Sequence, residues 1–317
     1  MNRYDEIIAG FTGKQHGLVA LWQTAAAGVP DHAMKARAAS RTLILVFSGV
    51  YRLRGVPYTQ ELRWLAAVLA AGPEAWLSHR AGATFHGYDI RFPKPEITIA
   101  HARECDLGGV ITHRTRRRHD VITVNGIPVT TKARTALDCA AVMAPEAFRQ
   151  MIESAVTAGI VKTEALLAVL QHRGGRGVEG TLLLRDTLAS GLVDEKIQRK
   201  LELLVARIID TCRVPAPVRQ HRLVCDDGRE VFLDNAWPDR KKAVEAVGLR
   251  WHGDRGQFVK TRLRARSIRQ SGWELDEFGW FEATEAVDEM RRSIEDFWAG
   301  SGRKGRPDPA QNEQSAA

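Results

Sequence analysis

Apolar residues recur at helical spacing in two long stretches of the chain. Residues 60–71 are amphipathic, and in 195–209 an apolar stripe runs along one side. Such spacing places the apolar side chains on one face of a helix. Shorter β-rich runs predict strands at 95–102 and 108–115, and again at 218–225, 230–237 and 242–248. The apolar stripe of 195–209 consists of Ile197, Leu201, Leu204, Val205 and Ile208.

The first 58 residues predict a small helical unit that closes on a hairpin. Helices are expected over 4–10, 18–27 and 31–39, with Pro30 well placed to open the third of them. Two β-rich runs then flank Ser48-Gly49, which is a hairpin signal. Three helices and a hairpin are the elements of a winged helix-turn-helix.

The order of the remaining elements predicts an α+β multidomain protein. Residues 59–192 are expected to form a mixed α/β middle domain, in which Thr135 and Asp138 have the spacing of a helix capping box. Residues 193–297 are expected to form a sheet flanked by helices, ending in a helix over 281–297. The polar residues 298–317 predict a disordered tail.

Composition narrows the functional classes. The net charge of +8 favours a polyanionic partner, although it says nothing about the fold. Four cysteines lie far apart without a CxxC pair, which argues against a zinc site and a disulfide framework. No apolar run approaches the length of about 18 residues that spans a bilayer, and the N-terminus is no secretory signal. We therefore expect a cytoplasmic protein without a membrane partner.

Basic residues in the N-terminal unit form a candidate surface for double-stranded DNA. Residues 1–60 hold seven Lys or Arg against three Asp or Glu, an excess suited to phosphate contacts. The helix over 31–39 and the hairpin supply the DNA-binding candidates Lys35, Arg37, Arg41 and Arg52. The hairpin run LILVF is unusually apolar, which indicates either burial or a dimer contact. A protein–protein role for the unit stays open as the alternative.

Two carboxylates on consecutive predicted strands form a candidate metal site. Asp234 and Glu245 have ten residues between them, so their side chains converge if the two strands are adjacent. Hard oxygen ligands of this kind suit Mg²⁺, which would orient a water and polarise a phosphodiester. The alternative is a pair of ordinary solvent-facing acids on edge strands.

The N-terminal two-thirds of the chain resembles the AbiEi-type antitoxins of bacterial abortive-infection systems. The resemblance rests on GVY at 49–51, LSHRAGATFHGY at 77–88 and GIPVTTKARTALDCAA at 126–141. It implies a winged helix that binds promoter DNA, joined to a domain that neutralises a cognate toxin or contacts DNA.

The C-terminal third resembles the domain family related to very-short-patch-repair endonucleases, which has the PD-(D/E)xK nuclease fold. The resemblance rests on LE at 201–202, LDNAWPDRKKAVEAVGLRWHG at 233–253 and RLRARSIRQSGWEL at 262–275. It implies a restriction-endonuclease-like domain in which Glu202, Asp234 and Glu245 are catalytic positions. Actinobacterial proteins often join this domain to an AbiEi-like one.

The chain departs from that endonuclease pattern at two positions. Val247 stands where the family has a second acid, and Thr261 stands where its closing helix has another. Valine neither ligates a metal nor handles a proton, so we expect only weak Mg²⁺ binding and a catalytically degraded site. His252 as a base, or Lys242 or Lys260 as a migrated cation, would be needed to restore activity.

These observations predict a DNA-binding protein of the antitoxin or transcriptional-regulator type that carries a degenerate nuclease-like domain. The alternative is a Mg²⁺-dependent endonuclease that the winged helix targets to DNA. A protein-interaction scaffold is the third class.

Overall fold

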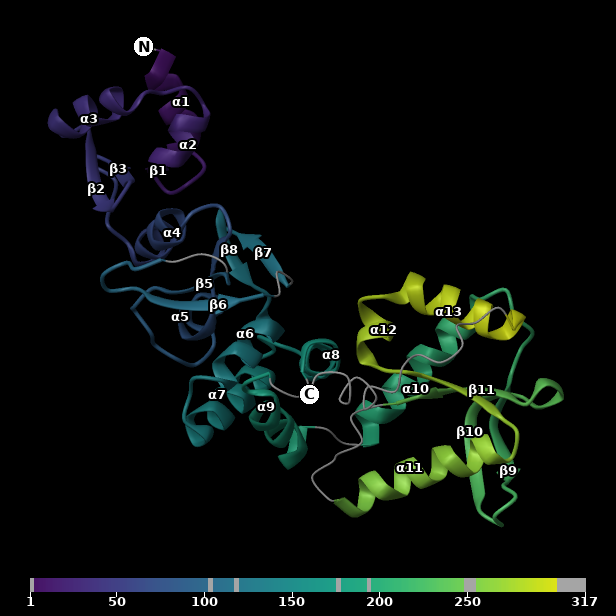
Figure 1. Cartoon of the computed structure of the whole chain (residues 1–317). Helices are drawn as coiled ribbons and strands as arrows, with labels where there is room; N and C mark the ends of the chain where they lie inside the picture. Colours follow the sequence, from purple (N-terminus) through teal and green to yellow (C-terminus); the bar gives the residue numbers. More distant parts are fainter. Residues whose placement is uncertain are drawn as a thin grey trace, which may run out of the picture. The chain divides into compact units, whose positions relative to one another are not determined.

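The computed structural model describes residues 3–101, 105–116, 120–174, 178–192, 195–247 and 255–300, without the side chains of 191, 192, 195, 196 and 255–262. Helices and strands are mixed throughout, and the described residues form three separate sheets, as the α+β class predicts (Figure 1). The chain divides into two compact units. The first comprises residues up to Lys162 together with Glu179–Leu184, and the second comprises Thr163–Val178 and the residues from Arg185 onward.

The first unit begins with three helices and a three-stranded antiparallel sheet of order β1-β3-β2. The predicted third helix and the hairpin around Ser48-Gly49 are confirmed. The predicted helix over 18–27 is wrong at its start, because Leu18–Ala20 pairs with β3 as a short strand. The elements are α1 (Arg3–Thr12), β1 (Leu18–Ala20), α2 (Leu21–Ala26), α3 (Asp31–Ala39), β2 (Leu43–Phe47) and β3 (Val50–Leu53).

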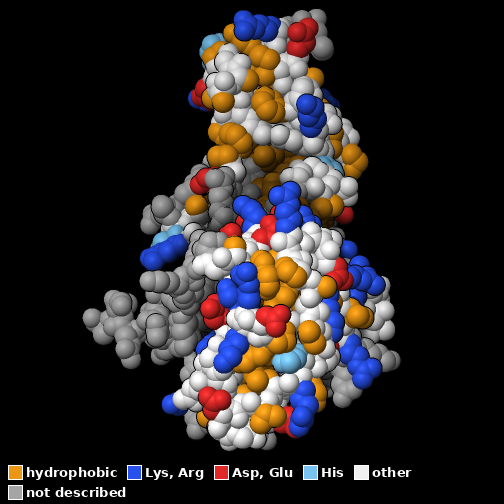
Figure 2. Space-filling model, turned by 90° about the vertical axis from the view of Figure 1, so that its right-hand side faces the viewer, with side chains coloured by type: hydrophobic (Ala, Val, Ile, Leu, Met, Phe, Trp, Pro, Cys, Tyr) orange, Lys and Arg blue, Asp and Glu red, His pale blue; other side chains and the backbone are white. Residues whose placement is uncertain are grey.

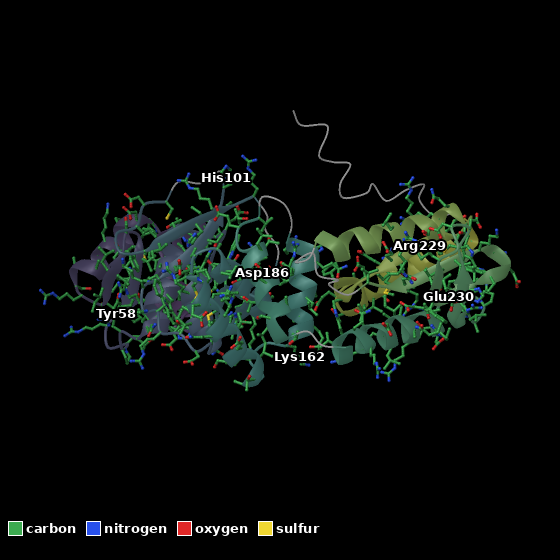
Figure 3. All side chains as sticks on the ribbon, turned by 90° about the horizontal axis from the view of Figure 1, so that it is seen from below. Tyr58, His101, Lys162, Asp186, Arg229 and Glu230 are labelled. Atoms are coloured by element: carbon green, nitrogen blue, oxygen red, sulfur yellow. The ribbon has the colours of Figure 1, made fainter. Side chains whose placement is uncertain are left out.

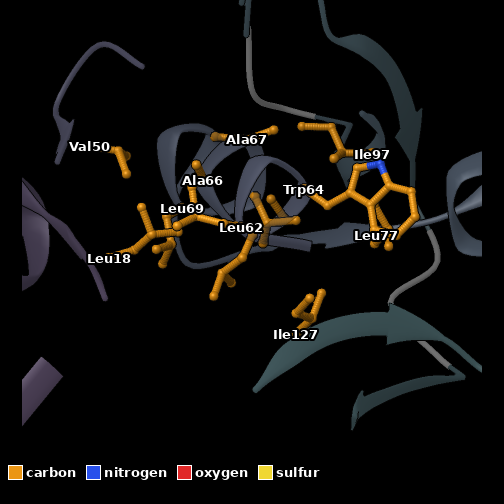
Figure 4. Packing of buried hydrophobic residues seen from close by; sticks show 14 of the residues in the cluster. Leu18, Val50, Leu62, Trp64, Ala66, Ala67, Leu69, Leu77, Ile97 and Ile127 are labelled. Carbon is orange, nitrogen blue, oxygen red and sulfur yellow. The ribbon is translucent and has the colours of Figure 1, made fainter. Parts of the chain in front are cut away.

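Helix α4 (Gln60–Ala71) joins this small sheet to the next one. The Thr59 side chain caps the helix by accepting a hydrogen bond from Leu62 N at 3.2 Å. Apolar side chains of α4 share one buried cluster with Leu18 and Val50 on one side and with Ile97 and Ile127 on the other (Figure 4). Residues 3–53 therefore share part of their apolar packing with α4, beside a second buried cluster of their own around Ile8, Val19 and Met34. Tyr58 in the connecting segment is 55% exposed (Figure 3).

The second sheet has five strands in the order β6-β5-β4-β8-β7. β4 and β8 are parallel neighbours, and each leads almost directly into a helix at the same edge of the sheet. The elements are β4 (Ala75–Leu77), α5 (His79–His86), β5 (Glu96–Ala100), β6 (Ile111–Thr115), β7 (Val121–Val124), β8 (Ile127–Thr130), α6 (Lys132–Ala140) and α7 (Pro145–Thr157).

The start of α6 corrects one expectation from the sequence. The N-cap is Thr131, whose hydroxyl accepts from Arg134 N, so the capping box predicted for Thr135 and Asp138 is wrong. Thr135 lies inside the helix, fully buried, and its hydroxyl bonds the Thr130 hydroxyl at 2.7 Å. Thr135 therefore packs between β8 and α6 and does not cap the helix.

The second unit contains a four-stranded sheet of order β12-β11-β10-β9, in which only β11 and β12 are parallel. The helix predicted over 281–297 is divided into α12 (Trp280–Thr284) and α13 (Val287–Ala299). Arg229 and Glu230 mark the start of β10 (Figure 3). The other elements are α8 (Thr163–Arg173), a π-helical turn (Leu188–Leu192), α10 (Glu195–Asp210), β9 (Val218–Val224), β10 (Glu230–Trp237), β11 (Lys242–Ala246), α11 (Arg255–Gln270) and β12 (Glu274–Phe278). Helix α9 (Thr181–Thr187) begins in the first unit and ends in the second.

The disordered tail predicted over 298–317 begins too early, because α13 continues through Trp298 to Ala299. Residues 301–317 lie outside the described residues. Among the helices that the structure describes, none combines the length and the apolar character needed to cross a bilayer.

Candidate functional site

The two candidate metal ligands lie beside each other in the second unit. β10 pairs with β11 through Asn235 opposite Val244, so one further step along this register sets Asp234 opposite Glu245. Asp234 Oδ2 accepts a hydrogen bond from Ala246 N at 3.1 Å, which fixes its carboxylate against β11. The strand adjacency expected from the sequence is therefore present.

Glu245 is bound on both carboxylate oxygens by Arg264 of α11. Arg264 Nη1 donates to Oε2 at 2.5 Å and Nη2 donates to Oε1 at 2.6 Å, while Nη2 also reaches Phe232 O at 2.7 Å. The Glu245 side chain is only 3% exposed. Burial opposes the charge of Arg264, but the hydrogen bond to Glu245 and the charges of Glu245, Asp234 and Glu277 raise its pKa above the ordinary value.

Glu202, the third expected position, is linked to the same part of β11 through a glutamine. Gln198 Nε2 donates to Glu202 Oε1 at 3.1 Å and to Ala246 O at 3.2 Å. Both residues lie on α10. The backbone of Ala246 is thus bonded by Asp234 on its N–H and by Gln198 on its carbonyl.

The residues present do not fit a divalent metal. Asp234 accepts hydrogen bonds from Gln220 and Ala246, and both carboxylate oxygens of Glu245 accept from Arg264. A guanidinium about 4 Å from an incoming cation would repel each of its charges by about 4 kcal/mol at an effective dielectric constant of about 20. In the described part of the chain, no three His, Cys, Asp or Glu side chains gather as a metal-binding group.

Of the groups that could restore catalytic activity, Lys242 is the one whose side chain the structure describes, and it makes its contacts elsewhere. Lys242 Nζ donates to Phe297 O at 2.5 Å and lies over the Phe297 ring, so its charge serves the contact with α13. Val247 contributes a backbone hydrogen bond to Phe278. His252 and the side chains of Lys260 and Thr261 lie outside what the structure describes.

The four DNA-binding candidates of the N-terminal unit divide into two exposed and two engaged side chains. Lys35 is 73% exposed and pairs with Asp31, and Arg41 is exposed two residues before β2. Arg37 instead binds Asp5 of α1 at 2.6 Å with a side chain only 16% exposed. Arg52 donates to Val56 O at 2.6 Å. Their contacts make Arg37 and Arg52 part of the packing of this unit.

A buried polar cluster in the five-stranded sheet was missed by the sequence analysis. Glu96, fully buried at the start of β5, accepts from Arg80 N, Nε and Nη2 and from His113 Nε2. The His113 ring stacks on the His79 ring with 3.6 Å between centroids. His79 Nδ1 lies 2.9 Å from Ser78 Oγ. The cluster lies where β4 passes into α5.

Burial and charge act on these groups in opposite directions. Burial alone would raise the pKa of Glu96, but the hydrogen bonds from His113 and Arg80 outweigh it and lower that pKa to about 2. Burial, with the charge of His113 adding to it, lowers the pKa of His79 to about 3. Burial raises the pKa of Asp138 to about 6, against the opposing charge of Arg134. Glu96 is therefore held charged and His79 neutral.

Asp138 is less well satisfied than Glu96. Its Oδ1 accepts from Arg134 Nε at 2.7 Å, whereas its buried Oδ2 has no hydrogen-bond partner among the described residues. Four segments that are distant in sequence meet here, and no sequence pattern connects them. They are residues 78–80, 96–98, 113 and 134–138. The only available sequence signal was the presence of several polar residues within otherwise apolar segments.

Comparison with known proteins gives relatives without an assigned activity. No family model matches the chain. Proteins from two strains of Mycobacterium tuberculosis, both described as uncharacterized, are 25% identical over 258 residues, covering 79% of this chain and 88% of each relative. The similarity extends over most of each chain. Because these relatives are described only as uncharacterized, the proposed function depends on the geometry of the candidate sites.

Proposed function

We propose that this chain is a DNA-binding protein of the antitoxin or transcriptional-regulator type, and that residues 3–53 form its winged helix-turn-helix. The order α1-β1-α2-α3-β2-β3, with the sheet order β1-β3-β2, supports this assignment. In this arrangement α3 is the recognition helix, which enters the major groove of duplex DNA.

The observation that carries the proposal is the set of exposed basic side chains on and after α3. Lys35 and Arg41 are exposed, and so is Arg54, which follows β3. Arg54 N donates to Thr42 O at 2.9 Å, so Arg41 and Arg54 leave the same end of the hairpin. Arginine and lysine side chains in this arrangement suit contacts with consecutive phosphates.

The hairpin turn itself is a poor candidate for a DNA contact. Leu21 N donates to Gly49 O at 2.8 Å, and Phe47 packs on the core that α4 shares. In the apolar run 43–47, which the sequence left open between burial and a dimer contact, Leu43 is buried, Leu45 is 59% exposed and the other three residues are half-buried. We therefore assign the phosphate contacts to α3 and to the open end of the hairpin.

The basic side chains outside residues 3–53 are spread out on the face that Figure 2 draws. Figure 2 shows one face of the molecule, where Lys and Arg side chains are dispersed among apolar and acidic ones rather than gathered in one patch. A dispersed net charge contributes to solubility and weak attraction, whereas a grouped set on a recognition helix can fix a register on DNA.

The test is salt-dependent DNA binding by the full chain, measured by fluorescence anisotropy on duplexes drawn from genomic DNA. The Arg41→Ala, Arg54→Ala double variant should bind about 10-fold more weakly and lower the salt slope by about 2, one unit for each lost phosphate contact. Arg149→Ala on α7 is the matched control and should bind as the parent does. Absence of salt-dependent binding to every duplex would remove the proposal.

The role of an antitoxin rests on the sequence resemblance. If it is correct, co-expression of this chain should relieve the growth arrest caused by a toxin encoded beside it. A regulator without a cognate toxin would bind DNA and give no such relief.

Cleavage of DNA is the second candidate function, because Asp234 and Glu245 lie side by side on adjacent strands. The engagement of Glu245 by Arg264 opposes it. A plasmid nicking assay with Mg²⁺ and Mn²⁺ compares the parent chain with Asp234→Ala and Val247→Asp. Robust cleavage by the parent that disappears in Asp234→Ala would establish the endonuclease.

A further inference from the structure

We infer that Arg264 is the resident cation of the carboxylate site on β10 and β11, and that it takes the place of a divalent metal there. The inference concerns the second unit alone, so it holds whether or not the N-terminal unit binds DNA. It explains why two strand carboxylates can keep their positions without metal-dependent chemistry.

The contacts of Arg264 match those that a hard cation would make. Its guanidinium binds both oxygens of Glu245 and the carbonyl of Phe232, all within 2.7 Å. Asp234 and Glu277 add their charges from the two strands on either side of β11. Carboxylate and carbonyl oxygens are the donors of a Mg²⁺ or Mn²⁺ site, and here they all face a side chain of the same molecule.

Helix α11 is fastened so that Arg264 stays in place. Ser267 Oγ donates to Asp227 Oδ2 at 2.5 Å, and Ser271 Oγ accepts from Asp226 N at 2.9 Å. Ile268, fully buried, packs in the core below the sheet. These contacts anchor the helix within one and two turns of Arg264, so a metal ion cannot gain the site by simple rotation of the helix.

The chemistry of arginine makes this replacement permanent at any physiological pH. A guanidinium is not deprotonated in proteins, and its planar pair of donors matches both oxygens of one carboxylate. A lysine in this position could lose its proton or turn away. Removal of the Arg264 charge should leave the buried Glu245 carboxylate beside Asp234 without a cation. A divalent metal ion could then bind between the two carboxylates.

The experiment is a Mn²⁺ titration of the full chain, followed by isothermal calorimetry and by the thermal midpoint. The parent chain should show no saturable binding up to millimolar Mn²⁺. Arg264→Met, which keeps an unbranched apolar stem and removes the guanidinium charge, should bind Mn²⁺ at least 10-fold more tightly and should be stabilised by it. Arg266→Met, at an exposed position of the same helix, should behave as the parent does.

A second substitution separates site binding from surface binding. Asp234→Asn added to Arg264→Met should abolish the gained affinity. If Arg264→Met is unfolded alone, Mn²⁺ should restore its folded circular dichroism spectrum. Saturable Mn²⁺ binding by the parent that is lost in Asp234→Asn would overturn the inference, and so would an Arg264→Met chain that gains no Mn²⁺ affinity or Mn²⁺-dependent folding.

Discussion

Glu96 in the first unit and Glu245 in the second are both buried strand glutamates held by an arginine from a helix, yet their surroundings differ. Glu96 accepts four hydrogen bonds, from three groups of Arg80 and from His113. Among the described residues, Glu245 accepts its side-chain hydrogen bonds from Arg264, and the charges of two more carboxylates, Asp234 and Glu277, act on that arginine. The carboxylate of Glu96 has four hydrogen-bond donors around it. Glu245 instead shares the positive charge of Arg264 with Asp234 and Glu277.

This difference means that a buried carboxylate is not by itself evidence for a catalytic or metal site. Glu96 has the burial and the lowered pKa of a functional acid, but its hydrogen-bond donors, Arg80 and His113, are side chains and backbone of the same protein. Glu245 occupies the position that the sequence pattern assigned to catalysis, and its contacts are also internal. The two glutamates should respond differently when their charge is removed.

Glu96→Gln should have the largest effect. The substitution leaves Arg80 and His113 around a neutral amide whose NH₂ group faces other donors, and breaking a buried pair in this way costs about 3–5 kcal/mol. Urea denaturation of the full chain measures the loss in the transition that reports on the first unit. Glu153→Gln, exposed on α7, is the control and should change stability by less than about 0.5 kcal/mol.

Asp138→Asn tests the opposite case, a carboxylate with an unpartnered oxygen. Because the folded pKa of Asp138 is about 6 and its ordinary value is 3.8, the protonated form favours the folded state. The stability that the neutral acid provides is complete below about pH 4 and declines as the pH rises through 6.

The Asn variant should therefore nearly match the parent at pH 4 and exceed its stability at pH 7 by about 3 kcal/mol, measured by thermal denaturation at both pH values. An Asn variant that is less stable at pH 7 than at pH 4, relative to the parent, would show that the Arg134 pair outweighs burial. Glu96 has the reverse sign, since stability from its lowered pKa is lost as the pH falls from 4.5 towards 2.

Glu245→Gln should have the smallest effect of the three. Asp234 and Glu277 remain to compensate the Arg264 charge, so we expect a loss of about 1.5 kcal/mol, at the lower end of the range for hydrogen bonds to charged groups. The measurement is the denaturation midpoint of the second unit. A loss as large as that of Glu96→Gln would contradict the contrast between the two sites.

Local patterns predicted much of the secondary structure. The bounds of α3, α4 and β10 agree with their predicted ranges, because capping residues and amphipathic spacing are local properties of the chain. Strand β1 was missed because Leu18–Ala20 continues directly into the apolar start of α2, where a short apolar run does not distinguish a strand from a helix. The pairing with β3 that decides the matter is 30 residues away in sequence.

The candidate sites were predictable only where they lie on neighbouring elements. Asp234 and Glu245 could be brought together because a short connection between two strands makes them adjacent. Arg264 was one of several arginines on a basic helix, with nothing in the sequence to select it as the partner of Glu245. His79 and His113 meet because their segments converge in the five-stranded sheet, a property of tertiary packing rather than of spacing.

Helix α4 also constrains how such a protein can be reassembled by recombination. Its apolar side chains contact Leu18 and Val50 of the small sheet and Ile97 and Ile127 of the next one (Figure 4). A crossover between residues 53 and 60 that brought in a foreign N-terminal unit would pair α4 with an unmatched apolar surface. If this unit binds DNA as proposed, an exchange of DNA specificity between homologues should include α4 or be limited to the exposed positions of α3.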